Sequence, residues 1–213
     1  ELKLPYEIIF VNDASEDKSL EELVSIDASN LVIVNLGRHY GQSQAMQAGF
    51  DTAGGEIIIT LDGDSQNDPC DIPKLLAKLE EGYDVVCGWR HDRKDNLGRR
   101  ISSKTAFILR RFIAHDKIHD VGCTLRVFKK SVLKDVYLSD GMHRFFTLIM
   151  QKLGYNIGEV KVNHRSRRFG KSKYNIRNRL FKGIIGLIKL SIFDIKDSIK
   201  PKLKYTIGEV IIK

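Results

Sequence analysis

Short apolar runs alternate with amphipathic segments throughout the first half of the chain, and this alternation constrains the fold more than any other feature. Apolar runs bounded by turn residues predict buried strands, and the segments between them have helical periodicity. Parallel strands need such helical crossovers, which cover both faces of a sheet. The pattern therefore predicts an α/β fold with a mostly parallel sheet flanked by helices.

The individual elements can be placed approximately. In the first half the predicted strands are 7–11, 31–34, 57–61 and 84–88, and the predicted helices are 18–26, 42–52 and 71–81. In the second half we expect helices near 97–114, 130–137 and 142–153, a partly extended segment at 120–128 and a strand near 157–163. The hexapeptide YNIGEV at 155–160 is echoed by YTIGEV at 205–210, but the match is too short to support an internal repeat.

Polar residues follow three of the predicted strands, at 12–13, 62–64 and 89–90. In open α/β sheets, ligands bind outside the carboxyl ends of the strands. We therefore expect the chemistry of this protein to lie where these three segments meet.

The strongest candidate site is the segment Leu61-Asp62-Gly63-Asp64-Ser65-Gln66. Two carboxylates at positions i and i+2 after a strand can present oxygens to one cation, and Gln66 adds a neutral oxygen. Mg²⁺ and Mn²⁺ prefer such oxygen ligands and usually keep substrate phosphate oxygens as well. The sequence therefore predicts that Asp62, Asp64 and Gln66 bind Mg²⁺ or Mn²⁺; the alternative is a solvated acidic turn.

A second acidic segment, 12–17, follows the first predicted strand. Ser15 or Asp17 can cap the helix that follows. Asp13 lies nearer the strand end and is better placed to contact a ribose or a base, so we predict that Asp13 and Ser15 contribute to donor binding.

Charge is divided unevenly along the chain, which carries a net +8 in total. Residues 1–96 contain 8 Lys and Arg against 19 Asp and Glu, whereas residues 97–213 contain 27 against 8. An acidic half can hold a metal, and a basic half attracts phosphates, anionic lipid or nucleic acid.

The three cysteines lack metal-type spacing and predict reduced, buried thiols of a cytosolic protein.

The segment 179–196 has a broad apolar face and a narrow stripe of Lys and Arg at helical spacing. Such a helix can lie in a membrane interface; the alternative is packing against the domain or another part of the chain. No signal peptide opens the sequence, and no apolar run reaches the roughly 18–20 residues of a membrane span. We predict a catalytic domain at 1–170 and a basic, amphipathic, membrane-proximal segment at 171–213.

The ordered segments VNDASEDKS, NLGRHYGQSQAMQAGF, GGEIIITLDGDSQNDP and DVVCGWR resemble family-2 glycosyltransferases of the GT-A fold. The later segments GRRISS, IHDVGCTLRVFKK and HRSRRFGKSKY resemble the polyprenyl-phosphate branch of that family, which includes dolichyl-phosphate mannose synthase-like enzymes. The resemblance covers about residues 7–190. The family's opening strand is not found in this sequence, so part of the donor pocket is expected to lie in a segment upstream.

The resemblance implies roles for the residues that match the family's motifs. On the donor side, Asp13 contacts the nucleoside, Asp62 and Asp64 with Gln66 bind the metal and the diphosphate, and Asp64 is catalytic. Arg167 opens a basic loop that closes on the donor phosphates, with Lys173 assisting.

On the acceptor side, the resemblance implies that Arg90, Arg99 and Ser103 bind a lipid phosphate. Arg90 and Arg99 are also placed among the catalytic residues. Arg99 and Ser103 are spaced i and i+4, so they would share a helical face. Asp120 matches a position in the family's acceptor segment and is included among the catalytic residues without an assigned role.

The implied reaction is transfer of a sugar from a UDP- or GDP-sugar to dolichyl or undecaprenyl phosphate, with inversion, at the cytoplasmic face of a membrane. Nucleic acid is not an expected partner, because aromatic residues do not interleave with the basic run. Two alternatives remain open: a GT-A enzyme that extends a glycan or polysaccharide hydroxyl, and a basic membrane- or nucleic-acid-binding module without catalysis.

Overall fold

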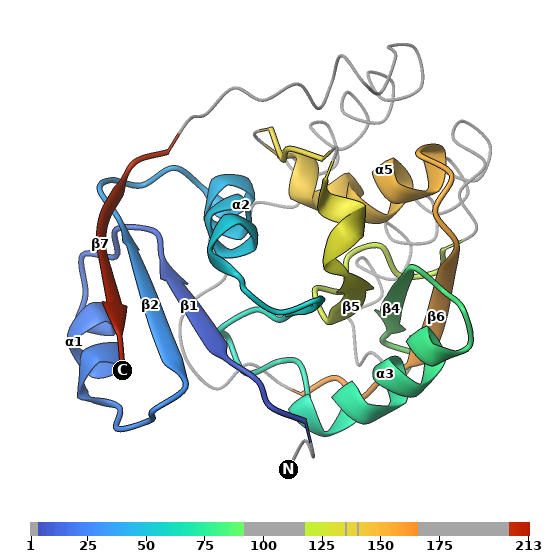
Figure 1. The fold of residues 1–213 in the computed structure, drawn as a ribbon, viewed down its shortest axis with the longest axis horizontal. Helices are drawn as coiled ribbons and strands as arrows, with labels where there is room; N and C mark the ends of the chain where they lie inside the picture. The colour runs from blue at the N-terminus through green and yellow to red at the C-terminus, as the bar shows by residue number, and fades with distance from the viewer. Residues whose placement is uncertain (1–3, 92–117, 135, 140, 166–204) are drawn as a thin grey trace, which may run out of the picture.

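The structure is a computed structural model that describes residues 4–91, 118–134, 136–139, 141–165 and 205–213 (Figure 1). It confirms the α/β class. The strands are β1 Ile8–Asn12, β2 Leu31–Leu36, β3 Ile57–Thr60, β4 Val85–Trp89, β5 Arg126–Lys129, β6 Ile157–Lys161 and β7 Ile207–Ile212. The α-helices are α1 Ser19–Ser25, α2 Gln42–Thr52, α3 Ile72–Glu80 and α5 Phe146–Lys152.

The described strands form two sheets, ordered β1-β2-β7 and β3-β5-β4-β6. β1 is parallel to β2, and β4 is parallel to β6. One strand in each sheet runs against its neighbours, β7 in the first and β5 in the second. In each sheet all strands but one therefore run in the same direction, although two of the five strand pairings are parallel and three are antiparallel.

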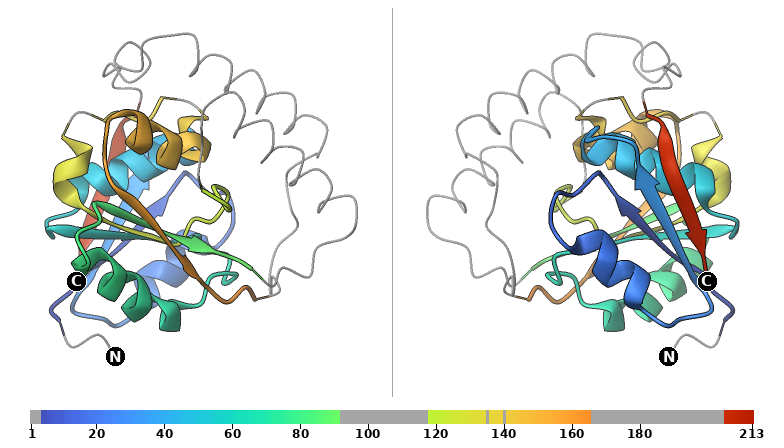
Figure 2. Two further views of the ribbon diagram at one scale, coloured as in Figure 1. Left: turned by 90° about the vertical axis from the view of Figure 1, so that its right-hand side faces the viewer. Right: turned by 90° about the vertical axis from the view of Figure 1, so that its left-hand side faces the viewer.

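The four-stranded sheet is covered on both faces, by α5 on one side and α3 on the other (Figures 1 and 2). Alternation along the strands sends Val85 and Cys87 toward α5 and Val86 toward α3. On the α5 side, Phe128 packs against Phe146 with ring centroids 5.0 Å apart. This double coverage explains why the strands carry continuous apolar runs.

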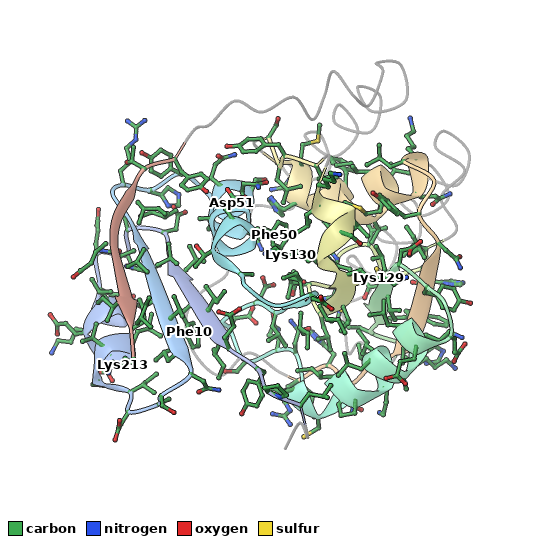
Figure 3. All side chains as sticks on the ribbon, viewed as in Figure 1. Phe10, Phe50, Asp51, Lys129, Lys130 and Lys213 are labelled. Atoms are coloured by element: carbon green, nitrogen blue, oxygen red, sulfur yellow. The ribbon has the colours of Figure 1, made fainter. Side chains whose placement is uncertain are left out.

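The end of the described chain returns to the first sheet. Residues 207–212, which belong to the predicted membrane-proximal segment 171–213, form β7 at the edge beside β2. The β-branched run from Val210 to Ile212 suits such a strand. Lys213 donates to the carbonyl oxygens of Val24 and Ile26, where α1 ends (Figure 3).

Other predictions fare differently. Within the described part of the predicted helix 130–137, the structure has a 3₁₀ turn at Lys130–Leu133 in place of an α-helix. The predicted helix 142–153 begins as a 3₁₀ turn, Met142–Phe145, and becomes α-helical at Phe146. The predicted helices 97–114 and 179–196 and the predicted boundary at residue 170 lie outside the described residues. In the part of the chain that the structure describes, no helix is long and apolar enough to cross a membrane.

Candidate active site

The site forms at the carboxyl-terminal edge of the four-stranded sheet. Thr60 near the end of β3 and Cys87 on β4 both pair with Arg126, the first residue of β5. Because β5 is antiparallel, it begins at the edge where β3 and β4 end. This arrangement brings the segment after β3, the segment after β4 and the start of β5 together.

Asp62 and Asp64 lie in the turn after β3. Asp62 Oδ1 accepts a hydrogen bond from Gln42 Nε2 at 3.0 Å, and Asp64 Oδ1 accepts one from the Gln66 amide at 3.1 Å. Ser65, the residue after Asp64, has φ 61°, in the left-handed region that few non-glycine residues adopt. Such conformations are concentrated at functional turns.

The charges around Asp62 are crowded. Burial raises the pKa of Asp62, and the negative charge of Asp64 raises it further. A hydrogen bond with Thr124 and the positive charges of Arg126 and Arg90 offset part of this effect. The pKa of Asp62 therefore responds to the charges of Asp64 and Arg90, and the joint role of the three residues stays a prediction.

This donor set fits a divalent cation. Within the described residues, no three His, Cys, Asp or Glu side chains form a complete metal site. Two neighbouring carboxylates are nevertheless oxygen ligands that Mg²⁺ and Mn²⁺ prefer when a substrate phosphate supplies the rest, and Gln66 is the residue predicted to add an amide oxygen. A bound cation would also offset the burial and, to a lesser extent, the Asp64 charge that raise the pKa of Asp62.

Arg90 follows β4 and is held by Asp120 through two side-chain bonds. Its Nε and Nη2 donate to the two carboxylate oxygens at 2.7 and 2.9 Å. Burial alone would lower the pKa of Arg90, but the bonds to Asp120 outweigh it and the pKa is raised. The guanidinium is thus a permanently charged group with a fixed orientation.

Asp13 has a different environment. Its two carboxylate oxygens accept hydrogen bonds from the Tyr40 and Gly41 amides at 2.7 and 2.8 Å. His39 Nδ1 lies 2.8 Å from one of them. The Ser15 amide donates to Asn12 Oδ1 at 3.3 Å. Asp13 therefore anchors the loop before α2 in this structure, and its predicted contact with the nucleoside remains a prediction.

Residues 164 and 165, the last described before 166, lie beside the turn after β3 that carries Asp62 and Asp64, here termed the metal-type turn. The Arg165 amide donates to the Gln66 carbonyl at 2.9 Å, and its guanidinium forms an ion pair with Asp68 at 2.7 Å. Asn67 forms an antiparallel bridge with His164. The predicted site residues Arg99, Ser103, Arg167 and Lys173 lie outside the described residues.

Asp120 was predicted as a site residue without a role, and the structure makes it the partner of Arg90. Three further residues of the site were not predicted. Gln42 and Thr124 hold Asp62, and Arg126 is a buried cation whose Nε has no hydrogen-bond partner in the described structure. The only signal for Arg126 was a charged residue at the head of an apolar run, Arg126–Phe128, which is weak evidence without knowledge of the strand direction.

A separate cavity of about 850 Å³ lies at the opposite edge of β3, where that strand begins. Its lining includes Phe50, Asp51, Lys129 and Lys130 (Figure 3). None of the predicted site residues lines it, so it is distinct from the strand-end site.

Sequence comparison supports an interpretation of the strand-end site. The family model described as glycosyl transferase family 2 matches residues 2–137. A dodecaprenyl-phosphate galacturonate synthase from Rhizobium johnstonii is 42% identical over 88% of this chain and 57% of its own length. An undecaprenyl-phosphate 4-deoxy-4-formamido-L-arabinose transferase from Yersinia enterocolitica is 36% identical over 82% of this chain and 54% of its own length. The chain thus spans a little over half the length of these relatives.

Structural comparison gives GT-A neighbours. A glucosyl-3-phosphoglycerate synthase from Mycobacterium tuberculosis, crystallised with Mn²⁺, uridine diphosphate and glucosyl-3-phosphoglycerate, superposes with a TM-score of 0.66 at 17% identity, covering 94% of this chain and 75% of the other. A mannosyl-3-phosphoglycerate synthase from Rubrobacter xylanophilus gives 0.65 at 16% identity, covering 85% and 62%. At these identities the likeness establishes the fold alone.

Proposed function

Because the chain belongs to glycosyl transferase family 2, we propose that it transfers a sugar from a nucleotide-sugar to a polyprenyl phosphate. The observation that carries this proposal is that an acidic pair and a basic side chain come together at one edge of the four-stranded sheet. A coupled carboxylate pair, Asp62 and Asp64, lies near an arginine that Asp120 holds in place. The printed names of the relatives, which act on dodecaprenyl and undecaprenyl phosphate, support the acceptor class.

The carboxylate pair would hold Mg²⁺ or Mn²⁺, with Gln66 as a further oxygen ligand. When bound, the cation stabilises the negative charge that develops on the departing nucleoside diphosphate. Solved neighbours that contain Mn²⁺ with uridine diphosphate support this assignment. Asp13 and Ser15 would face the nucleoside of a UDP- or GDP-sugar, and Arg167 and Lys173 would contact the donor phosphates.

Arg90 would bind the acceptor phosphate. Its charge persists at any physiological pH, and Asp120 fixes its direction, so it can orient the phosphate oxygen for in-line attack on the anomeric carbon. A phosphate is already anionic at neutral pH, and a strong general base is therefore not required. Arg99 and Ser103 are proposed as additional contacts of the same phosphate.

We also propose that the protein works at the cytoplasmic face of a membrane. A polyprenyl phosphate resides in a membrane, and the segment 179–196 has the composition of an interfacial helix. The proposed arrangement places a soluble donor and a membrane-bound acceptor on either side of the same sheet edge.

The test is transfer of radiolabelled sugar by the intact protein, supplied with Mn²⁺ and polyprenyl phosphate. We expect the product to partition into organic solvent, and we expect Asp64→Ala to abolish its formation. Label that appears only in a water-soluble glycan would instead identify a hydroxyl acceptor, and full activity of Asp64→Ala would argue against metal-assisted transfer.

A further inference from the structure

The Glu159 carboxylate gathers three hydrogen-bond donors from one short segment. It accepts from the His119 amide at 2.9 and 3.1 Å, from the Asp120 amide at 3.3 Å, and contacts His119 Nδ1 at 2.8 Å. Glu159 lies on β6, in register with Cys87 of β4. Its side chain is only 12% exposed, whereas the His119 side chain is 51% exposed.

Each residue that Glu159 holds contacts a residue near the end of β4. His119 contacts Trp89, the last residue of β4, and Asp120 contacts Arg90, which follows it. The His119 ring stacks on Trp89 with centroids 4.4 Å apart and planes at 14°. Asp120 binds the guanidinium of Arg90 through both of its oxygens. A single carboxylate on β6 therefore connects to the orientation of both Trp89 and Arg90.

From this geometry we propose that Glu159 is a positioning residue for the acceptor-phosphate site, an inference that rests on the proposed function. Arg90 can present its guanidinium in one direction only while Asp120 is fixed, and Asp120 is fixed in part through its own amide and that of its neighbour. Groups that orient a binding residue through a hydrogen bond commonly control its affinity. Loss of Glu159 should weaken acceptor binding more than donor binding.

The sequence supplies a matched control. The tetrapeptide Ile-Gly-Glu-Val occurs at 157–160 on β6 and again at 207–210 on β7. Glu209 has the same neighbours in sequence and also lies on an edge strand, but it is exposed and pairs with Asn35 of β2. A substitution at Glu209 therefore repeats the local change at Glu159 away from the site.

The experiment compares Glu159→Ala, Glu159→Gln and Glu209→Ala in the intact protein with a UDP-sugar or GDP-sugar, Mn²⁺ and polyprenyl phosphate. We expect Glu159→Ala to raise the KM for polyprenyl phosphate about tenfold, the lower end of what loss of an orienting partner causes. The donor KM and kcat should change less than about twofold. Glu159→Gln retains one acceptor oxygen and should recover part of the effect, and Glu209→Ala should match the wild type.

Trp89 provides a second measurement because it is the single tryptophan of the chain. Its stack on His119 should loosen in Glu159→Ala, so acrylamide should quench its fluorescence more strongly than in the wild type or Glu209→Ala. An active wild type combined with an unchanged acceptor KM in Glu159→Ala would overturn this inference alone. A wild type that transfers no sugar to lipid phosphate would overturn the proposed function, and the acceptor role of Glu159 with it.

Discussion

The turns after β1 and after β3 have a similar backbone but place their carboxylates in different environments. Each contains one non-glycine residue in the left-handed region, Ala14 with φ 50° and Ser65 with φ 61°. In the first turn, both oxygens of Asp13 accept backbone amides. In the second, Asp62 is near the charge of Asp64, and burial raises its pKa.

This difference distinguishes two kinds of carboxylate. Asp13, which holds backbone amides, is termed the scaffold carboxylate, and Asp62 is termed the site carboxylate. A carboxylate that accepts several N–H groups is satisfied by its own protein, whereas crowded carboxylates gain most from an external cation. The two turns are also connected, because Asp13 binds the amides of Tyr40 and Gly41, and the next residue, Gln42, reaches Asp62. The first turn therefore supports the second.

The largest expected effect tests the site carboxylate. Asp62→Asn should lower sugar transfer by about a thousandfold, because loss of a preorganised electrostatic group at a charge-developing centre costs about 3–4 kcal/mol. The metal-free protein should not lose stability at neutral pH. Burial raises the folded pKa of Asp62, so its contribution to stability is present at low pH and is lost as pH rises through that pKa. Turnover assays and urea denaturation measure the two quantities; a large loss of stability would place Asp62 in the scaffold class.

Metal addition should sharpen the same contrast. With Mn²⁺ at about one hundred times its dissociation constant, the free energy of unfolding of the wild type should rise by about 2.7 kcal/mol. Asp13→Asn should show the same increase, because its side chain contacts backbone amides rather than the metal-type turn. Asp62→Asn should show little. Thermal unfolding with and without Mn²⁺ measures this stabilisation, and EDTA should reverse the stabilisation. Equal responses of all three proteins would contradict metal binding by Asp62.

The scaffold carboxylate should show a smaller effect on stability. In Asp13→Asn, the amide of either Tyr40 or Gly41 faces an NH₂ group and loses its acceptor. The free energy of unfolding should therefore fall by about 1–2 kcal/mol. Transfer activity should fall much less than in Asp62→Asn. Urea denaturation and turnover of the two variants side by side provide the measurement, and an activity loss as deep as that of Asp62→Asn would assign Asp13 a direct catalytic contact.

The smallest effect concerns Asp68, which follows the metal-type turn. The Cys70 amide, and then the Arg165 guanidinium, lower its pKa. Its contribution to stability is therefore present above the ordinary Asp pKa and is lost as pH falls through the lowered value, the opposite sign to Asp62. Asp68→Asn should flatten the acid side of the stability profile, measured by thermal unfolding between about pH 2 and 5. Because its partner Arg165 is half-exposed, the change should be small.

Much of the fold could be predicted from the sequence because the first half follows local rules. The predicted helix 42–52 agrees with the observed helix, and the first four predicted strands are displaced by at most a few residues. The turn after β3 could also be located, because Asp62 and Asp64 are only two positions apart in the sequence. Metal binding by these residues stays a prediction. Periodicity and motif spacing carry such features without knowledge of the tertiary structure.

The contacts that orient Arg90 could not be predicted, because they join segments distant in the sequence. Asp120 meets Arg90, and Glu159 meets His119, only because β5 is antiparallel and β6 lies beside β4. The strand at 207–212 was missed for a related reason. Its pairing with β2 depends on a partner that precedes it by most of the chain, and local composition suggested a membrane segment instead.

The return of the chain at β7 has a mechanical consequence. Arg165 is fixed to Asp68, and the Tyr205 hydroxyl donates to Asp51 on α2 at 2.5 Å. The covalent stretch from 166 to 204 thus leaves and re-enters one folded body. If this stretch makes the proposed membrane contact, the domain would be connected to the bilayer at two points. Two points of attachment restrict the rotation of the domain more than a single tether does. Adsorption would then set which way the sheet edge faces.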